Sequence, residues 1–536
     1  MRTLRVALMS LLTVLVTATA ASAVHVTDGA DVKVTNDNNN VDGGTPNPGF
    51  DAQNRQSNET TVAISPADPS IVATGANDYR MVTVTGDVWY GLYVSADGGA
   101  TWFNTMVPGF PSDASAAGLA SPLLGLDGSG DPVVRFDASG NMYAAGIAFN
   151  RDFDQPDRPI DTVSYVARYN YTPGTPGGTS SSTSAANPPN FTYVRTRVVD
   201  RGSVGFAVPG VVGFAGDFVD KEWMEIDTNA SSASPCAGNI YVAQTNFHAS
   251  GTSPIRFSRS TNGGLTFSKP KGISTGGTSG TRSNQGADIA VGPDGTVFVA
   301  YQTDAGGNDR ESGIGIVRST DCGRSWGQPV RVGSLVQGQA PGVAFRTPTF
   351  AVVSVDDTDS ETVYVAYQSL VDGDYDILAQ RSADGGSTWG APVTVNDDPG
   401  DRHQIFPTMD VSHGALHVAW YDFRNSTTAA NEALDVYYAC TDCAGSTWPT
   451  FSHVERVSDV SHNGNCLLFG GGTAAFHGDY NELDAVWNGT NHIVHVAWAD
   501  NRDVSPCDLD PAAGPASNNT GNRNQNIYAD TLTVAP

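Results

Sequence analysis

A short segment that recurs along the chain is the feature that most restricts how this protein can fold. It follows the pattern Ser-x-Asp/Asn-x-Gly-x-Thr/Ser-aromatic, and four copies occupy residues 95–102, 260–267, 319–326 and 382–389. The Asp or Asn side chain can hydrogen-bond the backbone just ahead of it, and the glycine can adopt the positive φ of a tight turn. The closing aromatic side chain can bury a large apolar area. Each copy predicts a β-hairpin with the same corner, and a corner repeated at long intervals predicts a repeat architecture.

The rest of the chain favours an all-β fold. Runs of Val, Thr and Tyr are interrupted roughly every 8–12 residues by Gly, Asp, Asn and Pro, and no long stretch has a helical period. A longer unit recurs between the hairpin corners, in which 288–295, 296–301 and 329–332 give the first, second and fourth strands. Units of four antiparallel strands are typical of a β-propeller, with one unit per blade.

Seven such units can be counted, and a six-bladed ring is the alternative if the irregular second unit is not a blade. That unit lacks the turn motif, and residues 172–189, rich in Pro, Gly, Ser and Thr, are predicted to form a flexible surface insertion there. The seventh unit is one strand short. Residues 31–37, ahead of the first unit, are similar to the fourth strand at 391–397. We therefore expect the N-terminal segment to complete the last blade and close the ring, which removes its exposed edges.

The first 23 residues have the form of a secretory signal peptide. Arg2 and Arg5 precede an apolar run, and small residues up to Ala23 fit a cleavage site. The apolar run is too short to span a membrane. We expect a secreted, extracellular protein with an N-terminal segment at 24–56 and a propeller domain at 57–536. A net charge of −27 argues against nucleic acid or an anionic membrane as partner.

Six cysteines in a chain expected to be secreted predict disulfide bonds. One pair lies in turns of adjacent blades on the face that carries the hairpin corners, a second pair spans its own turn, and a third lies on the opposite face of the seventh blade. The predicted pairs are Cys236 with Cys322, Cys440 with Cys443, and Cys466 with Cys507. A zinc site is not predicted, because no second cysteine pair or histidines at ligand spacing accompany the Cys-x-x-Cys segment.

The turn pattern resembles the Asp-box, or bacterial neuraminidase repeat, and the chain from about Ser57 to Val534 resembles the sialidase superfamily of β-propellers. The resemblance implies that the boxes lie on the face opposite to the catalytic one. It also implies an exo-glycosidase of sialidase type that acts on sialylated or other acidic glycans; a non-catalytic glycan- or protein-binding propeller is the alternative. We expect a monomer whose partner is an extracellular glycan or glycoprotein. No cofactor is expected; structural calcium near the acidic loops is conceivable, although no spacing specifies it.

Arginines that precede the inner strands are candidates for substrate binding. Sialidases bind the sialic acid carboxylate through three arginines, and guanidinium groups suit a carboxylate because they bind it with two parallel hydrogen bonds. The alternative is that each arginine braces its neighbouring blade. The four candidates are Arg55, Arg282, Arg346 and Arg402.

The resemblance also implies a catalytic trio, since sialidases use a tyrosine nucleophile, a glutamate that activates it and an aspartic acid/base. Tyr480, Glu222 and Asp78 are predicted for these roles. In the alternative reading Tyr480 only lines the mouth, Glu222 pairs with Lys221, and Asp78 forms a local ion pair. The chain departs from the family pattern in two respects: it has no Arg-Ile-Pro motif at the first inner strand, and its blade count is seven where catalytic sialidase propellers have six.

Overall fold

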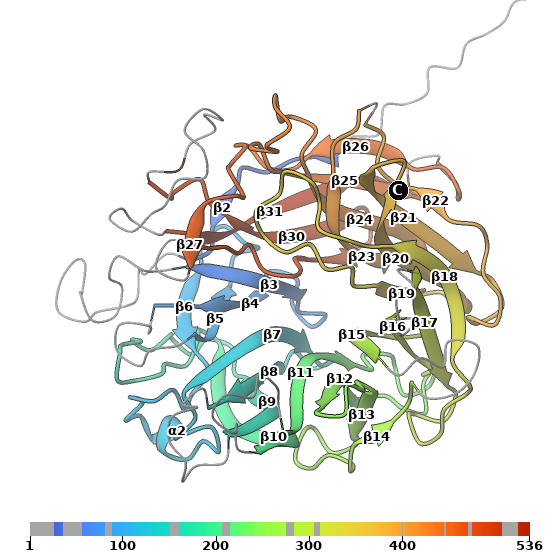
Figure 1. Ribbon diagram of the computed structural model, residues 1–536. Helices are drawn as coiled ribbons and strands as arrows, with labels where there is room; N and C mark the ends of the chain where they lie inside the picture. Colours follow the sequence, from blue (N-terminus) through green and yellow to red (C-terminus); the bar gives the residue numbers. More distant parts are fainter. Residues whose placement is uncertain are drawn as a thin grey trace, which may run out of the picture.

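The computed structural model describes residues 26–35, 56–80, 88–150, 160–205, 215–274, 283–304, 311–398, 400–443, 446–469, 474–505, 507 and 524–536. These residues form a ring of seven four-stranded antiparallel blades, so the predicted fold and blade count are confirmed (Figure 1). The predicted signal peptide lies outside the described residues. None of the helices in the described ranges is long and apolar enough to cross a membrane.

Each blade begins with an inner strand that lines the central channel. Blade 1 contains β3 (Ser57–Ile64), β4 (Val72–Asp78), β5 (Trp89–Ser95) and β6 (Phe103–Met106). Blade 2 contains β7 (Gly128–Phe136), β8 (Met142–Phe149), β9 (Ile160–Tyr171) and β10 (Phe191–Gly205). Blade 3 contains β11 (Ala215–Ile226), β12 (Ile240–His248), β13 (Ile255–Ser260) and β14 (Lys271–Gly272). Blade 4 contains β15 (Ser283–Val291), β16 (Val297–Asp304), β17 (Glu311–Ser319) and β18 (Val330–Val336). Blade 5 contains β19 (Val352–Asp356), β20 (Asp359–Val371), β21 (Asp374–Ser382) and β22 (Val393–Thr394). Blade 6 contains β23 (Gln404–Ser412), β24 (Ala415–Asp422), β25 (Asp435–Thr441) and β26 (Ser452–Arg456). Blade 7 contains β29 (Glu482–Trp487), β30 (His492–Asp500) and β31 (Asn526–Val534). Outside the blades lie α2 (Ala116–Leu119), β27 (Leu467–Phe469) and β28 (Ala474–Ala475).

The N-terminal segment closes the ring as predicted. Two short strands, β1 (Val26–Thr27) and β2 (Val32–Lys33), pair antiparallel with β31, with Val32 opposite Ala529. The Val34 N–H donates to the Ile527 carbonyl at 2.9 Å, and the Val34 side chain is fully buried. The last blade therefore takes its outer strand from the opposite end of the chain.

The insertion at 172–189 lies between β9 and β10, where other blades carry the turn motif. It hydrogen-bonds to blade 1, because the Ala186 N–H donates to Thr105 Oγ1 at 3.0 Å and Ser112 Oγ donates to the Ser182 carbonyl at 2.5 Å. A second irregularity follows, since β10 continues into a pairing with β11 that joins blades 2 and 3 into one sheet.

The repeated turns have the predicted corner geometry. At the fourth copy, Ser382 Oγ donates to Asp384 Oδ1 at 2.8 Å, and the Thr388 hydroxyl and N–H donate to the same carboxylate at 2.6 and 2.8 Å. The bonds from Thr388 and Ser382 lower the pKa of Asp384 to about 2. The turns join third to fourth strands, so they lie on the face opposite to the start of the inner strands.

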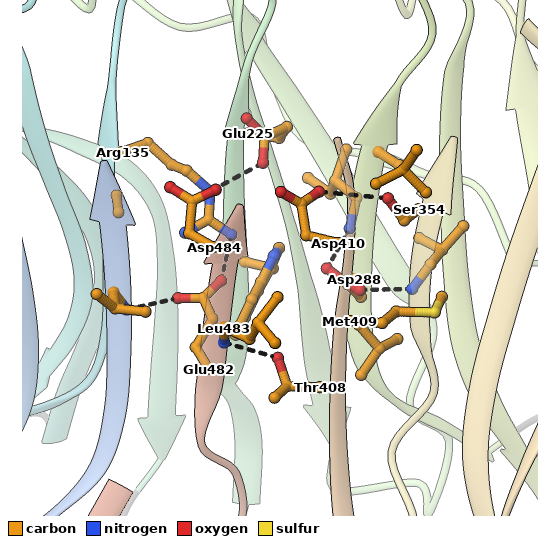
Figure 2. Close-up of a pocket in the computed structure, with 18 of the residues that line it drawn as sticks. Arg135, Glu225, Asp288, Ser354, Thr408, Met409, Asp410, Glu482, Leu483 and Asp484 are labelled. Atoms are coloured by element: carbon orange, nitrogen blue, oxygen red, sulfur yellow. Dashed lines mark hydrogen bonds and ion pairs between the residues drawn. The ribbon is translucent and has the colours of Figure 1, made fainter. Parts of the chain in front are cut away.

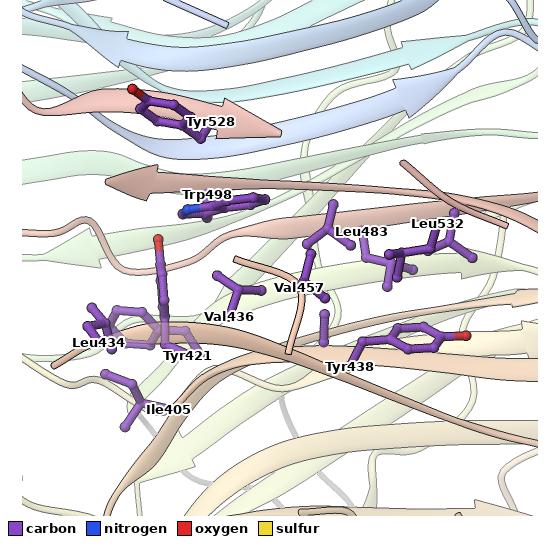
Figure 3. Packing of buried hydrophobic residues seen from close by; sticks show 14 of the residues in the cluster. Ile405, Tyr421, Leu434, Val436, Tyr438, Val457, Leu483, Trp498, Tyr528 and Leu532 are labelled. Carbon is purple, nitrogen blue, oxygen red and sulfur yellow. The ribbon is translucent and has the colours of Figure 1, made fainter. Parts of the chain in front are cut away.

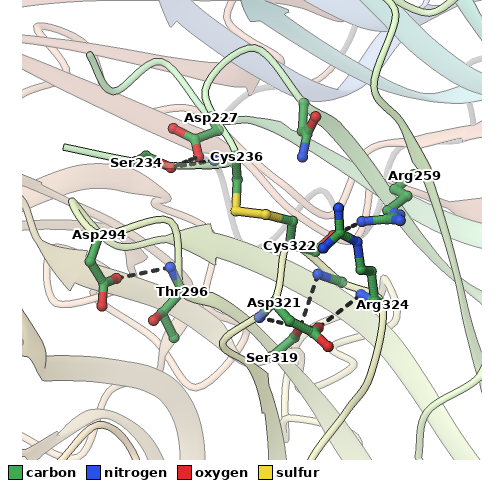
Figure 4. The surroundings of a disulfide bond; sticks show 12 residues. Asp227, Ser234, Cys236, Arg259, Asp294, Thr296, Ser319, Asp321, Cys322 and Arg324 are labelled. Carbon is green, nitrogen blue, oxygen red and sulfur yellow. Dashed lines mark hydrogen bonds between the residues drawn. A yellow bond between two sulfur atoms is a disulfide. The ribbon is translucent and has the colours of Figure 1, made fainter. Parts of the chain in front are cut away.

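All three predicted disulfides are present. Cys236–Cys322 joins blades 3 and 4 beside the third turn (Figure 4), and the other bonds are Cys440–Cys443 and Cys466–Cys507. Cys322 has φ +62°, and the equivalent position of the other three turns is a glycine with φ between +63° and +68°. The disulfide therefore accompanies a left-handed backbone conformation that glycine adopts more easily.

The hydrophobic core lies mainly between neighbouring blades. Figure 3 shows the cluster shared by blades 6 and 7, in which Tyr421, Val436 and Trp498 are buried. Second strands have neighbours on both faces, and every residue of β24 is buried. This explains why apolar residues take successive positions in this strand, as at 418–421, rather than alternating ones.

Candidate active site at the channel mouth

The mouth of the channel is shaped by β-bulges in the inner strands. The registers of β3, β7, β11, β15 and β23 each shift where the strand enters the ring. One residue in each bulge has φ between +50° and +63°; these residues are Glu59, Asp131, Lys221, Gly286 and Phe406. A bulge turns a side chain away from ordinary strand alternation. The equivalent positions of blades 5 and 7, two residues before β19 and β29, are Phe350 and Tyr480.

These seven residues form a ring, which we call the upper ring, with two chemically different halves. Blades 1 to 3 contribute Glu59, Asp131 and Lys221, whereas blades 5 to 7 contribute the aromatic residues Phe350, Phe406 and Tyr480. The two halves meet across the Lys221 ammonium, which lies 5.2 Å from the Tyr480 ring centre and 5.7 Å from that of Phe350. The arrangement offers hydrogen-bonding groups on one side and apolar ring faces on the other.

A buried ion network centres on Lys221. Its Nζ lies 2.7 Å from Asp479 Oδ2, 3.2 Å from Glu59 Oε1 and 3.8 Å from Asp131 Oδ1. Arg346 binds the same Asp479 with two parallel hydrogen bonds of 2.5 and 2.6 Å. Asn77 donates to Glu59 and accepts the Asp131 N–H, so it ties the bulges of blades 1 and 2 together.

The network separates the protonation states of its carboxyl groups. Burial opposes ionisation of Asp479, but Lys221 and Arg346 outweigh it and lower the pKa of that carboxyl. Burial raises the pKa of Glu59 to about 8 and that of Asp131 to about 6, although Lys221 acts in the opposite direction on both. At neutral pH Asp479 is therefore ionised, Asp131 is mostly ionised, and Glu59 holds its proton.

Below the upper ring the channel forms a cavity of about 350 Å³, lined by all seven inner strands and by Asp479 and Tyr480. Its carboxyl groups cap unpaired N–H groups along the inner edges of the blades (Figure 2). Asp288 accepts from Val353 N at 2.7 Å, and Glu482 accepts from Val62 N at 2.9 Å and from Arg135 Nη2 at 2.6 Å. These bonds link blade 4 to blade 5 and blade 7 to blades 1 and 2.

The cavity carboxyls differ from Asp479 in charge. Burial raises the pKa of Asp288 to about 8, and it raises that of Glu482 to about 7 against the opposing effect of Arg135. Burial and the charge of Asp484 also raise the pKa of Asp410, and the side chains of Asp410 and Asp484 are hydrogen-bonded to each other. The cavity therefore pairs an ionised carboxylate at its mouth with a protonated carboxyl, Asp288, in the wall of blade 4.

Gly286 lies two residues before Asp288 in β15 and lines the same cavity. A Cβ at this position would lie 2.1 Å from Phe350 Cδ1, and its φ of +63° disfavours any other residue. We expect Gly286→Ala to displace Phe350 and to lower the free energy of unfolding by about 2 kcal/mol, through overpacking and backbone strain. Gly272→Ala is the matched control, because nothing lies within 4 Å of its Cβ. Urea denaturation of both variants measures the difference, and equal stabilities would contradict this account.

The structure places Asp78 away from the cavity. Asp78 is fully buried, with Arg80 Nε donating to it at 2.6 Å and the Tyr93 hydroxyl at 2.5 Å. The same Asp-x-Arg arrangement recurs at Asp422 and Asp500, as expected for local ion pairs.

Tyr480 and Glu222 are not joined by a hydrogen bond. Tyr480 lies in the upper ring with its ring edge-on to Trp223, 5.8 Å between centres. Within the described part of the chain, both carboxylate oxygens of Glu222 are buried without a hydrogen-bond partner. Burial, followed by the charges of Asp131 and Glu59, raises the pKa of Tyr480 well above its ordinary value.

The described arginines do not converge. Arg346 lies at the mouth on Asp479, whereas Arg402 Nη1 donates to the Thr428 carbonyl at 2.5 Å and braces that loop. Arg55 and Arg282 lie outside the described residues. Among the described residues, no group of three or more His, Cys, Asp or Glu side chains is arranged to hold a metal ion.

Comparisons with known proteins find similar structures only. The chain matches no family model and no curated protein sequence. It is similar to a protein of unknown function from Dyadobacter fermentans (11% identity, 95% of this chain and 99% of that one, TM-score 0.43). It is also similar to Trypanosoma rangeli sialidase (10% identity, 69% of this chain and 53% of that one, TM-score 0.38). A third similar structure is Penicillium chrysogenum α-L-arabinanase (12% identity, 74% of this chain and 94% of that one, TM-score 0.39). The match spans about half the length of the sialidase.

Proposed function

We propose that this protein is a glycoside hydrolase whose active site is the upper part of the central channel. One observation carries the proposal: Asp479 and Asp288 line the same cavity from blades 7 and 4, which lie across the ring from each other. Glycosidases place two carboxyl groups on either side of the scissile bond, one protonated and one ionised. The opposite pKa shifts of the two groups match this division of roles.

The proposed chemistry follows from the positions of the two groups. Asp288 donates its proton to the glycosidic oxygen as the leaving group departs, and Asp479 either attacks the sugar or removes a proton from the attacking water. Lys221 and Arg346 keep Asp479 ionised. The aromatic half of the upper ring provides apolar faces for a sugar ring, and a 350 Å³ cavity is within the ordinary range for small-ligand sites.

A sialidase-type reaction is the second candidate, because Tyr480 lies in the upper ring and Arg346, whose side chain is 58% exposed, could meet a substrate carboxylate. The raised pKa of Tyr480 makes its phenolate costly to form, and Glu222 is not bonded to it. The carboxyl pair is therefore the better-supported mechanism.

Hydrolysis of a panel of fluorogenic glycosides, including a sialoside and an α-L-arabinofuranoside, tests the proposal. Turnover that is lost in Asp288→Asn supports the carboxyl pair. Turnover of the sialoside alone, lost in Tyr480→Phe but kept in Asp288→Asn, would favour the second candidate. Absence of turnover for every glycoside would favour a non-catalytic, glycan-binding propeller.

The pH dependence of kcat/KM is expected to be bell-shaped. Asp288 must be protonated, so activity should fall as pH rises through about 8. Asp479 must be ionised, so the acid limb should lie below its ordinary pKa of 3.8. Initial rates between pH 3 and pH 10 measure the alkaline limb and show whether activity persists down to pH 3.8, and an alkaline limb below pH 6 would contradict the assignment of Asp288 as the acid.

We also infer secretion after removal of residues 1–23, supported by the three disulfides, which persist in oxidising compartments. N-terminal sequencing of protein from the culture medium should begin at Val24.

A further inference from the structure

A row of aromatic side chains leads away from Asp479 along the rim between blades 7 and 1. Arg346, which binds Asp479, stacks over Phe476 with 4.9 Å between its guanidinium carbon and the ring centre. Phe476 packs edge-to-face on Phe469 at 5.4 Å, and Phe469 packs edge-to-face on Tyr79 at 5.1 Å. The three rings are partly exposed. We call Tyr79, Phe469 and Phe476 the rim aromatics.

Their chemistry differs from that of the surrounding mouth. The upper ring and its ion network use most of their polar atoms on one another, whereas the rim aromatics expose apolar ring surface beside a guanidinium that is 58% exposed. Arg346 binds Asp479 through Nε and Nη2, and Nη2 also lies 3.7 Å from Glu59 Oε1, so these contacts leave the N–H groups of Nη1 unused. Apolar surface beside an exposed guanidinium suits a sugar, whose C–H face packs on aromatic rings while its hydroxyls accept hydrogen bonds.

We propose that the rim aromatics form a second carbohydrate subsite, which binds the sugar units beyond the one in the channel. The proposal rests on the proposed function, because it assumes that the cleaved sugar lies next to Asp479. The row is continuous with that carboxylate through Arg346, so a chain that leaves the channel meets Arg346 and Phe476 first and Tyr79 last. The substrate is then an oligosaccharide or a glycan chain rather than a single sugar with a small aglycone.

Binding is measured on the Asp479→Asn protein, in which turnover is expected to be slow, by isothermal titration with arabinotriose and 3′-sialyllactose and with arabinose and sialic acid. Phe476→Ala and Tyr79→Leu are expected to weaken binding of the preferred trisaccharide about tenfold and to leave binding of its monosaccharide unchanged. Phe451→Ala is the matched control, because Phe451 is a partly exposed aromatic packed on Trp448 beside the turns on the opposite face. Melting temperatures verify that each variant is folded.

The proposal is overturned if both rim variants bind the trisaccharide as the Asp479→Asn protein does, or if they weaken trisaccharide and monosaccharide equally. It is also overturned if none of the four sugars binds. If the trisaccharide binds through the rim aromatics while the parent protein hydrolyses nothing, the second subsite stands and the proposed function fails.

Discussion

Asparagine in place of Asp479 or Asp288 is expected to lower kcat/KM by between about 10²- and 10⁴-fold on any glycoside that the protein hydrolyses. Asp479→Asn removes the carboxylate that Lys221 and Arg346 keep ionised, so no base remains at the mouth. Asp288→Asn keeps the shape of the protonated carboxyl but has no proton to give to the leaving group. A 10³-fold loss corresponds to about 4 kcal/mol of transition-state stabilisation.

The matched control is Asp410→Asn. Asp410 lies lower in the same cavity, has a raised pKa and caps the Ala485 N–H at 3.1 Å, so its replacement changes the channel wall without touching the proposed pair. Activity within a few-fold of the parent is expected for this variant. Equal losses in all three variants would show that any change in the channel wall disturbs activity, and unchanged rates in Asp479→Asn would place the chemistry elsewhere.

The activity lost in the two variants should also depend differently on the leaving group of the glycoside. An activated aryl glycoside departs without much help from a proton, so Asp288→Asn should lose less activity on it than on an alkyl glycoside, whereas Asp479→Asn should lose similar activity on both. Rates on a matched pair of aryl and alkyl glycosides measure this difference. The opposite pattern would exchange the two roles.

The architecture was accessible from the sequence because its determinants are local and repeated. Each turn motif specifies its own corner through bonds among a few neighbouring residues, such as those of Asp384 to Ser382 and Thr388. The spacing of the corners then gave the unit length, and the strand missing from the last unit indicated that the N-terminal segment closes the ring. The topology that followed from the blade count was enough to pair the cysteines.

The site was less accessible, because it depends on which way each bulge turns its side chains. The sequence predicts catalytic roles for Glu222 and Tyr480, whereas the structure brings together their neighbours Lys221 and Asp479. Side chains of a strand alternate between faces, so a bulge of one residue exchanges the residue that faces the channel with the one that faces the next blade. The positive φ at Glu59 and at Lys221 could not be predicted from residue type, because neither residue is glycine.

Removal of the segment that closes the ring is expected to cause the largest loss of stability. A chain that begins at Asn36 lacks β1 and β2, and with them the ion pairs Lys33–Asp503 and Arg502–Asp31, of 2.9 and 2.7 Å. It also lacks the buried Val34 side chain. Burial of a valine contributes about 1.5–3 kcal/mol, and each lost hydrogen bond about 1 kcal/mol, so a loss of roughly 5 kcal/mol is expected relative to a chain that begins at Val24.

The exposed edge of β31 should have a second consequence, because unpaired edge strands template association. The shorter chain is therefore expected to unfold at lower urea and to form oligomers at concentrations where the longer chain is monomeric, as measured by denaturation and light scattering. Val34→Ala isolates the packing contribution and should cost about 2 kcal/mol, whereas Val194→Ala, at a side chain that is 37% exposed, should change stability by less than about 0.5 kcal/mol. If the chains that begin at Val24 and Asn36 unfold at the same urea concentration, the pairing of β2 with β31 does not hold the ring closed.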